Sequence, residues 1–129
     1  MVPDCPNCHR KTDDRLLFGF CRRCVEDIDA EARPLVFTLN TLPGIQTIES
    51  CCGHGTEPFR IWFEVSLYDK SGLKIIQRAV EHKEWPQGER WTVCKSNMQL
   101  FTWILSSADV GPQVFGQSRL LCRHLKGSS

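Results

Sequence analysis

Hydrophobic and polar residues alternate most clearly over residues 59–68. The apolar set on one side of this stretch consists of Phe59, Ile61, Phe63, Val65 and Leu67. Alternation with a period of two predicts a β-strand with one buried face. Residues 45–50 predict a preceding strand, and the two strands should pair antiparallel across the turn that contains Gly53, His54 and Gly55.

Other apolar runs have helical or extended periodicity. Residues 35–42 fit either type, and a helix is favoured because Leu35, Leu39 and Leu42 would share one face. The remaining expected elements are a helix over 73–82, strands over 91–95 and 100–105, and a helix over 114–125. The run over 100–105 is apolar on both faces, which predicts a central strand.

This order of elements predicts an α+β fold, with an antiparallel or mixed sheet and helices on one face. The chain has 129 residues, 41% of them hydrophobic, which fits one main core with a small appendage. We therefore expect a four-cysteine zinc-binding module over residues 1–33 and an α+β ligand-binding domain over residues 34–129.

Charge and hydropathy limit the classes of partner. Sixteen basic and fifteen acidic residues leave a net charge of +1, so the whole molecule offers no argument for nucleic acid or an anionic membrane, although a local patch stays open. No apolar run approaches the roughly 18 residues of a spanning helix, and the first residues do not resemble a signal peptide. These features predict a cytoplasmic protein with no membrane partner.

Four of the eight cysteines form two Cys-x-x-Cys pairs. The pairs are Cys5 with Cys8 and Cys21 with Cys24, separated by twelve residues. Four thiolates at this spacing suit the tetrahedral preference of zinc, so we expect one structural Zn²⁺ bound by them. Paired cysteines without a secretion signal fit this interpretation better than a disulfide framework.

This first segment resembles the treble-clef and zinc-ribbon modules. The resemblance covers about thirty residues and includes a ligand pair at the start of an expected helix over 25–32, which Pro34 should end. Such modules serve nucleic-acid binding, protein contacts or stabilisation alike, so all three roles remain open.

Polar and reactive groups gather at the turn between the first two predicted strands. The candidate ligand-binding residues are Glu49, Ser50, Cys51, Cys52, Gly53, His54, Gly55 and Arg60. Glycine permits positive φ, and successive backbone N–H groups in such a turn can form a nest for phosphate or carboxylate. Arg60 begins the return strand, where its guanidinium could clamp the same anion. The simpler alternative is a tight hairpin turn with its cysteines buried as small hydrophobic residues.

A second metal ion at Cys51, Cys52 and His54 is a further alternative. Adjacent strand residues point to opposite faces, so one ion would struggle to take both cysteines. A complete site would need another ligand. The candidates for it are Cys94, His82 and His124.

A resemblance to a known family also involves this turn. Leu39-Asn40, followed by Ile45-Gln-Thr-Ile-Glu-Ser-Cys-Cys-Gly-His54, resembles the Thr-x-Ser-Ser-Cys-Ser-Gly-Arg stretch of the wybutosine-synthesising tRNA methyltransferase family, the third protein of that pathway. The resemblance extends over residues 39–63. It implies an α+β fold, S-adenosylmethionine as cofactor and a tRNA guanosine derivative as substrate, with Ser50, Cys51 and Gly53 aligned to the motif.

Three functional classes compete. The favoured one is a zinc-containing protein, phage-encoded or from a mobile element, that binds a nucleotide, nucleic acid or other anion at the turn, because no complete catalytic set can be assembled from sequence. The second is an enzyme acting on RNA or a nucleotide, with His54 as general acid or base, Cys51 or Cys52 as nucleophile and Glu49 orienting the imidazole. The third is a zinc-stabilised protein-interaction module.

Overall fold

The computed structural model describes residues 28–82, 85, 90–97 and 101–128. The predicted zinc ligands lie outside these residues: Cys5, Cys8, Cys21 and Cys24. The described elements, in chain order, are α2 (Arg33–Asn40), β1 (Ile45–Cys51), the short 3₁₀-helix η2 (Gly53–Gly55), β2 (Pro58–Val65), α3 (Ser71–Val80), β3 (Thr92–Lys95), β4 (Thr102–Val110) and α4 (Gln113–Ser128). This succession of helices and strands is the one that the hydrophobic pattern predicts.

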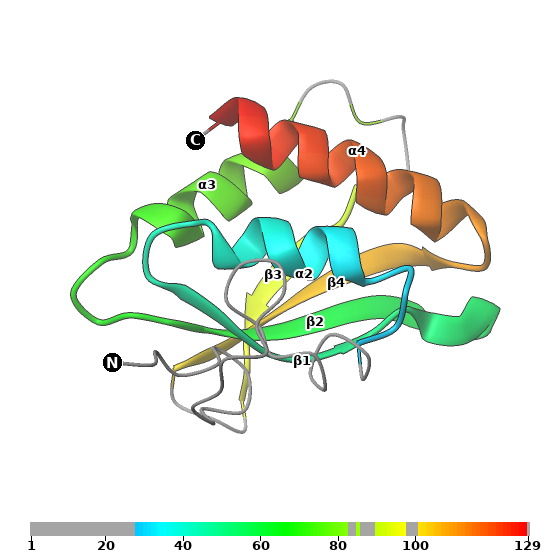
Figure 1. The fold of residues 1–129 in the computed structure, drawn as a ribbon, viewed down its shortest axis with the longest axis horizontal. Helices are drawn as coiled ribbons and strands as arrows, with labels where there is room; N and C mark the ends of the chain where they lie inside the picture. The colour runs from blue at the N-terminus through cyan, green and yellow to red at the C-terminus, as the bar shows by residue number, and fades with distance from the viewer. Residues whose placement is uncertain (1–27, 83–84, 86–89, 98–100, 129) are drawn as a thin grey trace, which may run out of the picture.

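The described strands form one antiparallel sheet in the order β1-β2-β4-β3. The helices α2, α3 and α4 lie together on one side of this sheet (Figure 1). The α+β class is therefore confirmed, and the sheet is antiparallel rather than mixed. β4 lies between β2 and β3, as its apolar run predicts, and it continues to Val110.

The core lies between the sheet and the helices. Phe59, Ile61 and Phe63 of β2 are completely buried, whereas Arg60 and Trp62 between them are not. The opposing helix surfaces supply further buried side chains, which include Leu35, Leu39, Ile76, Leu121 and Leu125. Each such side chain contributes roughly 1.5–3 kcal/mol by leaving water, so this contact holds the helix layer against the sheet.

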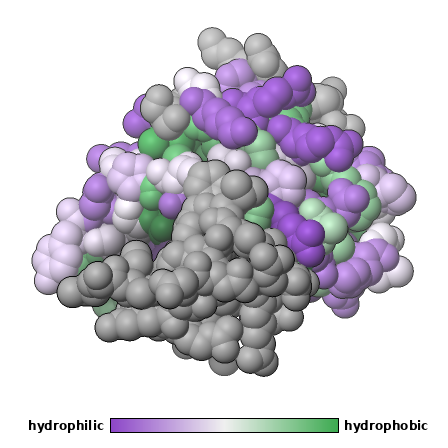
Figure 2. All heavy atoms as spheres, viewed as in Figure 1, coloured by the Kyte–Doolittle hydropathy of each residue, from purple (hydrophilic) through white to green (hydrophobic). Residues whose placement is uncertain are grey.

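The outer surface of the helix layer is mainly hydrophilic, as the upper part of Figure 2 shows. The helices are amphipathic, with their apolar sides turned toward the sheet. No helix among the described residues has the length and hydrophobicity needed to cross a membrane.

The start of the first described helix differs from the prediction. Residues 28–32, expected to be helical, form a bend and turns, and α2 begins at Arg33. Pro34 lies in the first turn of α2, where a missing N–H costs nothing, so it starts this helix rather than ending one. Ile28 and Ala32 are buried in the core although the predicted domain boundary placed them with the first module.

The second strand is shorter than its alternating pattern. β2 ends at Val65, and Leu67 and Tyr68 beyond it are exposed. One further bond, from the Ser66 N–H to the Gly44 carbonyl, continues the register with β1, and the Ser66 hydroxyl then accepts from the Tyr68 N–H. The alternating sequence pattern therefore extends beyond the end of β2.

A register shift of one residue divides β1 into two halves. Thr47 pairs with Phe63 and Glu49 pairs with Trp62, so β1 advances two residues while β2 advances one. Such an extra residue reverses the face to which later side chains point. Beyond it Cys51 pairs with Arg60 and shares the face of the sheet opposite the helices, which carries the even-numbered residues of β2.

Asn40, the last residue of α2, anchors β1 just before this shift. Its side-chain amide donates to the Val36 carbonyl at 2.8 Å and to the Thr47 hydroxyl at 2.7 Å, and its amide oxygen accepts from the Thr47 N–H at 3.2 Å. The first half of β1 is thereby fixed to the helix layer.

Replacing Phe63 by Ala should lower the free energy of unfolding by about 3–5 kcal/mol, because it removes a completely buried ring and leaves a cavity. Chemical denaturation measures this change. Tyr68→Ala is the control, since Tyr68 is 97% exposed and its loss should change stability by less than about 0.5 kcal/mol. Equal effects of the two changes would contradict the described core.

Candidate metal centre

The turn between β1 and β2 has an unusual backbone. Gly53, His54 and Gly55 have φ angles of 82°, 49° and 83°, all in the left-handed region. A side chain at Gly53 would also meet the Pro58 carbonyl at 3.1 Å, so glycine is required there on two grounds. At His54 the same conformation costs a residue with a Cβ roughly 1–2 kcal/mol. This backbone conformation sets the direction in which the His54 side chain leaves the turn.

Asp29 reaches this turn from the loop before α2. Its Oδ2 accepts a hydrogen bond from the Cys52 backbone N–H at 3.1 Å and lies 3.6 Å from His54 Nε2. The bond to Cys52 joins residues 23 positions apart in the chain. The carboxylate is thus held beside the imidazole by the backbone of the turn.

Cys51 brings a sulfur atom to the same place. The Gly53 N–H donates to Cys51 Sγ at 3.4 Å. Three donor atoms, one from each of these residues, lie within 4.8 Å of one another: they belong to Asp29, Cys51 and His54. In tetrahedral zinc sites the ligand atoms lie roughly 3.3–3.8 Å apart, given metal–ligand distances of about 2.0–2.3 Å. The three residues form a candidate metal-binding site that needs only about 1 Å of further convergence.

Cys52 is separated from this site although it is the neighbour of Cys51. It is buried, with Sγ 3.6 Å from His54 Nδ1 on the side of the ring away from Nε2. Burial raises the pKa of the Cys52 thiol above its usual value. Cys52 therefore stays a neutral thiol near physiological pH. Its sulfur contacts the His54 ring at Nδ1 and leaves Nε2 facing Asp29.

Arg60 lies beside Cys51 through the pairing of β1 with β2. Its Nη2 is 3.6 Å from Glu57 Oε2, and its guanidinium carbon is 5.5 Å from the centre of the Trp62 ring. Arg60 Nε is buried and has no hydrogen-bond partner among the described residues. The Arg60 side chain as a whole is 37% exposed, so its guanidinium group is accessible on the face of Cys51.

The other residues predicted at the turn do not contribute to this cluster. Glu49 is exposed and pairs with Trp62, so it shares the face of Cys51 but is not among the clustered donors, whereas Ser50 pairs with Ile61 and so shares the face that carries the core. Gly55 is exposed, and a side chain there would meet no atom within 4 Å. The structure therefore clusters Cys51 with His54 and pairs Cys51 with Arg60, while Glu49 and Ser50 are not among the clustered donors.

The further ligands expected from sequence are not the ones that the structure provides. Cys94 lies on β3, at the opposite edge of the sheet from β1, and His82 and His124 stack on each other at 3.9 Å next to Trp85. The third donor is Asp29, for which the sequence carries no local signal. Cys51 and His54 were already candidates from the sequence, as part of the alternative second metal site.

No protein-family model, curated protein or solved structure matches this chain. The resemblances to zinc ribbons and to the wybutosine-synthesising methyltransferases therefore stay predictions.

Alkylation should distinguish the buried thiol from an exposed one. Because only the thiolate reacts, the raised pKa of Cys52 shifts its half-maximal rate to higher pH. Near pH 8, iodoacetamide should modify Cys94, which is exposed, at least about tenfold faster than Cys52. Peptide mapping by mass spectrometry measures both rates in one sample. Comparable rates would show that Cys52 is accessible and ionised.

Proposed function

We propose that this protein binds a zinc ion through Asp29, Cys51 and His54 and uses the open fourth position of that ion to bind an anionic ligand. The observation that supports this most strongly is the convergence of an oxygen, a sulfur and a nitrogen donor from two separate parts of the chain within 4.8 Å. Zinc accepts all three donor types, and three protein ligands are typical of sites that leave one position for water or a ligand.

The surroundings of the three donors suit metal ligands. Backbone N–H groups of Cys52 and Gly53 donate to the carboxylate and the thiolate, as groups around a metal site commonly do to orient its ligands. With Nε2 on the metal, the imidazole proton resides on Nδ1 and faces Cys52 Sγ at 3.6 Å. The His54 tautomer that binds zinc through Nε2 thus carries its proton on Nδ1, where the Cys52 sulfur can accept it in a hydrogen bond.

Exposure and charge favour an anion at the open position. The His54 side chain is 67% exposed and that of Asp29 31%, so a ligand can approach the ion from solvent. One carboxylate and one thiolate balance the charge of Zn²⁺, and Arg60 adds a positive charge on the face of Cys51. A phosphate or carboxylate would contact both the ion and the guanidinium.

Metal content tests the ion. The purified protein should contain about two zinc equivalents per chain, one for the predicted four-cysteine module and one for the turn. Asp29→Asn, Cys51→Ser and His54→Gln should each remove about one equivalent while leaving the other. Cys94→Ser is the matched control and should keep both. Unchanged zinc in the three turn variants would overturn the proposal.

Anion binding tests the open position. Cobalt substituted at the turn should change its visible absorption when phosphate is added, because the anion replaces a coordinated water. Arg60→Gln should weaken this response about tenfold through loss of a charge-assisted contact. Arg123→Gln, on the exposed side of α4, is the control for general charge effects and should leave the response intact. An equal response to phosphate in the Arg60→Gln variant would show that Arg60 does not contact the anion.

A further inference from the structure

β3 forms one edge of the described sheet, and half of its peptide groups point away from β4. The Ser96 N–H donates to the Thr102 carbonyl at 2.8 Å, and the two strands keep the register in which Cys94 pairs with Ile104. Peptide groups alternate along a strand, so those of Thr92 and Cys94 also face β4. The N–H and carbonyl groups of Val93 and Lys95 therefore face the open edge.

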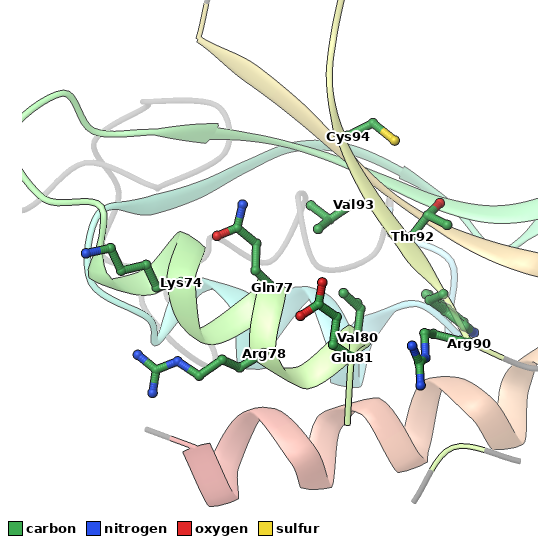
Figure 3. Close-up of a pocket in the computed structure, with 10 residues that line it drawn as sticks. Lys74, Gln77, Arg78, Val80, Glu81, Arg90, Thr92, Val93 and Cys94 are labelled. Carbon is green, nitrogen blue, oxygen red and sulfur yellow. The ribbon is translucent and has the colours of Figure 1, made fainter. Parts of the chain in front are cut away.

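A groove of about 650 Å³ runs between this edge and α3. Its walls are formed by Gln77, Val80 and Glu81 from the helix and by Val93 from the strand, with Trp91 at one end. Figure 3 shows Gln77 and Val93 pointing toward each other across it, while Cys94 points away. An extended chain in this groove would have an open strand edge on one side and a helix on the other.

The groove has a positive margin. Lys74 and Arg78 lie four residues apart on α3, and Arg90 lines the end near Trp91, against one acidic residue, Glu81. Lys74 and Arg78 extend from the exposed side of the helix in Figure 3, and neither forms an ion pair within the described part of the chain. Lys95 adds a further positive charge on the edge strand itself.

We propose that this groove binds an extended, acidic peptide segment of a partner protein, which adds to β3 as a further antiparallel or parallel strand. The peptide groups of Val93 and Lys95 pair with its backbone, and Lys74 and Arg78 bind carboxylates on the side chains that project over α3. Four residues of β3 span about 13 Å, enough to pair with three or four peptide residues. This inference does not rest on the proposed metal site at the turn, which follows β1, the edge strand on the other side of the sheet.

Fluorescence anisotropy with a labelled eight-residue peptide of alternating glutamate and valine tests the proposal on the full chain. Binding should saturate, and the Lys74→Glu, Arg78→Glu double variant should weaken it at least about tenfold. Arg123→Glu, a charge reversal on α4 outside the groove, should leave it unchanged. Equal binding of a peptide of alternating lysine and valine would overturn the proposal.

The backbone contact has its own test. Val93→Pro removes only an N–H that faces the open edge and should abolish binding, whereas Val93→Thr keeps the N–H and should bind. Amide exchange of the unmutated protein covers the case in which the proline variant does not fold. Saturating peptide should slow exchange at Val93 and Lys95 more than at Thr92 and Cys94, which already donate within the sheet. Binding that leaves the exchange of Val93 and Lys95 unaltered would show an anion site without strand addition, and the proposal would fail.

Discussion

The register shift between Thr47 and Glu49 is the constraint on which the candidate metal centre depends. Without the extra residue, Cys51 would pair with Phe59 and share the face that carries the core. With it, the same cysteine shares the face of Arg60, and Cys52 takes the buried direction instead. The shift therefore gives the two neighbouring thiols different surroundings: Cys51 is one of the candidate metal ligands, and Cys52 lies next to Nδ1 of the His54 ring.

Two contacts from the helix layer hold the strand on either side of this shift. The Asn40 side chain bonds Thr47 before it, and the Asp29 carboxylate accepts from the Cys52 N–H after it. Asn40 is the last residue of α2 and Asp29 precedes this helix, whose apolar side is buried against the sheet. The packing of one short helix thus positions a carboxylate and a sulfur that lie 22 residues apart in the chain.

The two edges of the sheet are used differently. At β1 the chain leaves the strand through left-handed residues and exposes polar side-chain donors. At β3 the strand is short and straight in register, and its own peptide groups form the exposed feature. The candidate metal centre and the proposed peptide groove thus lie at separate edges of one core, and the central strands β2 and β4 carry most of the buried side chains of the described sheet.

The sequence by itself determined the order of elements, the antiparallel pairing across the glycine-rich turn and the central place of β4. These follow from local periodicity, which records which side chains must leave water. It also indicated that Cys51 and Cys52 would not serve one ion, since neighbours on a strand diverge.

Only the tertiary structure decided that Asp29 joins Cys51 and His54, and that Cys94, His82 and His124 do not. A register shift and a contact between distant segments leave no periodic trace, because they arise from the packing of α2 on β1 rather than from any local pattern. The groove beside β3 was likewise decided by the tertiary structure, since α3 and β3 come together only because both pack on the same core.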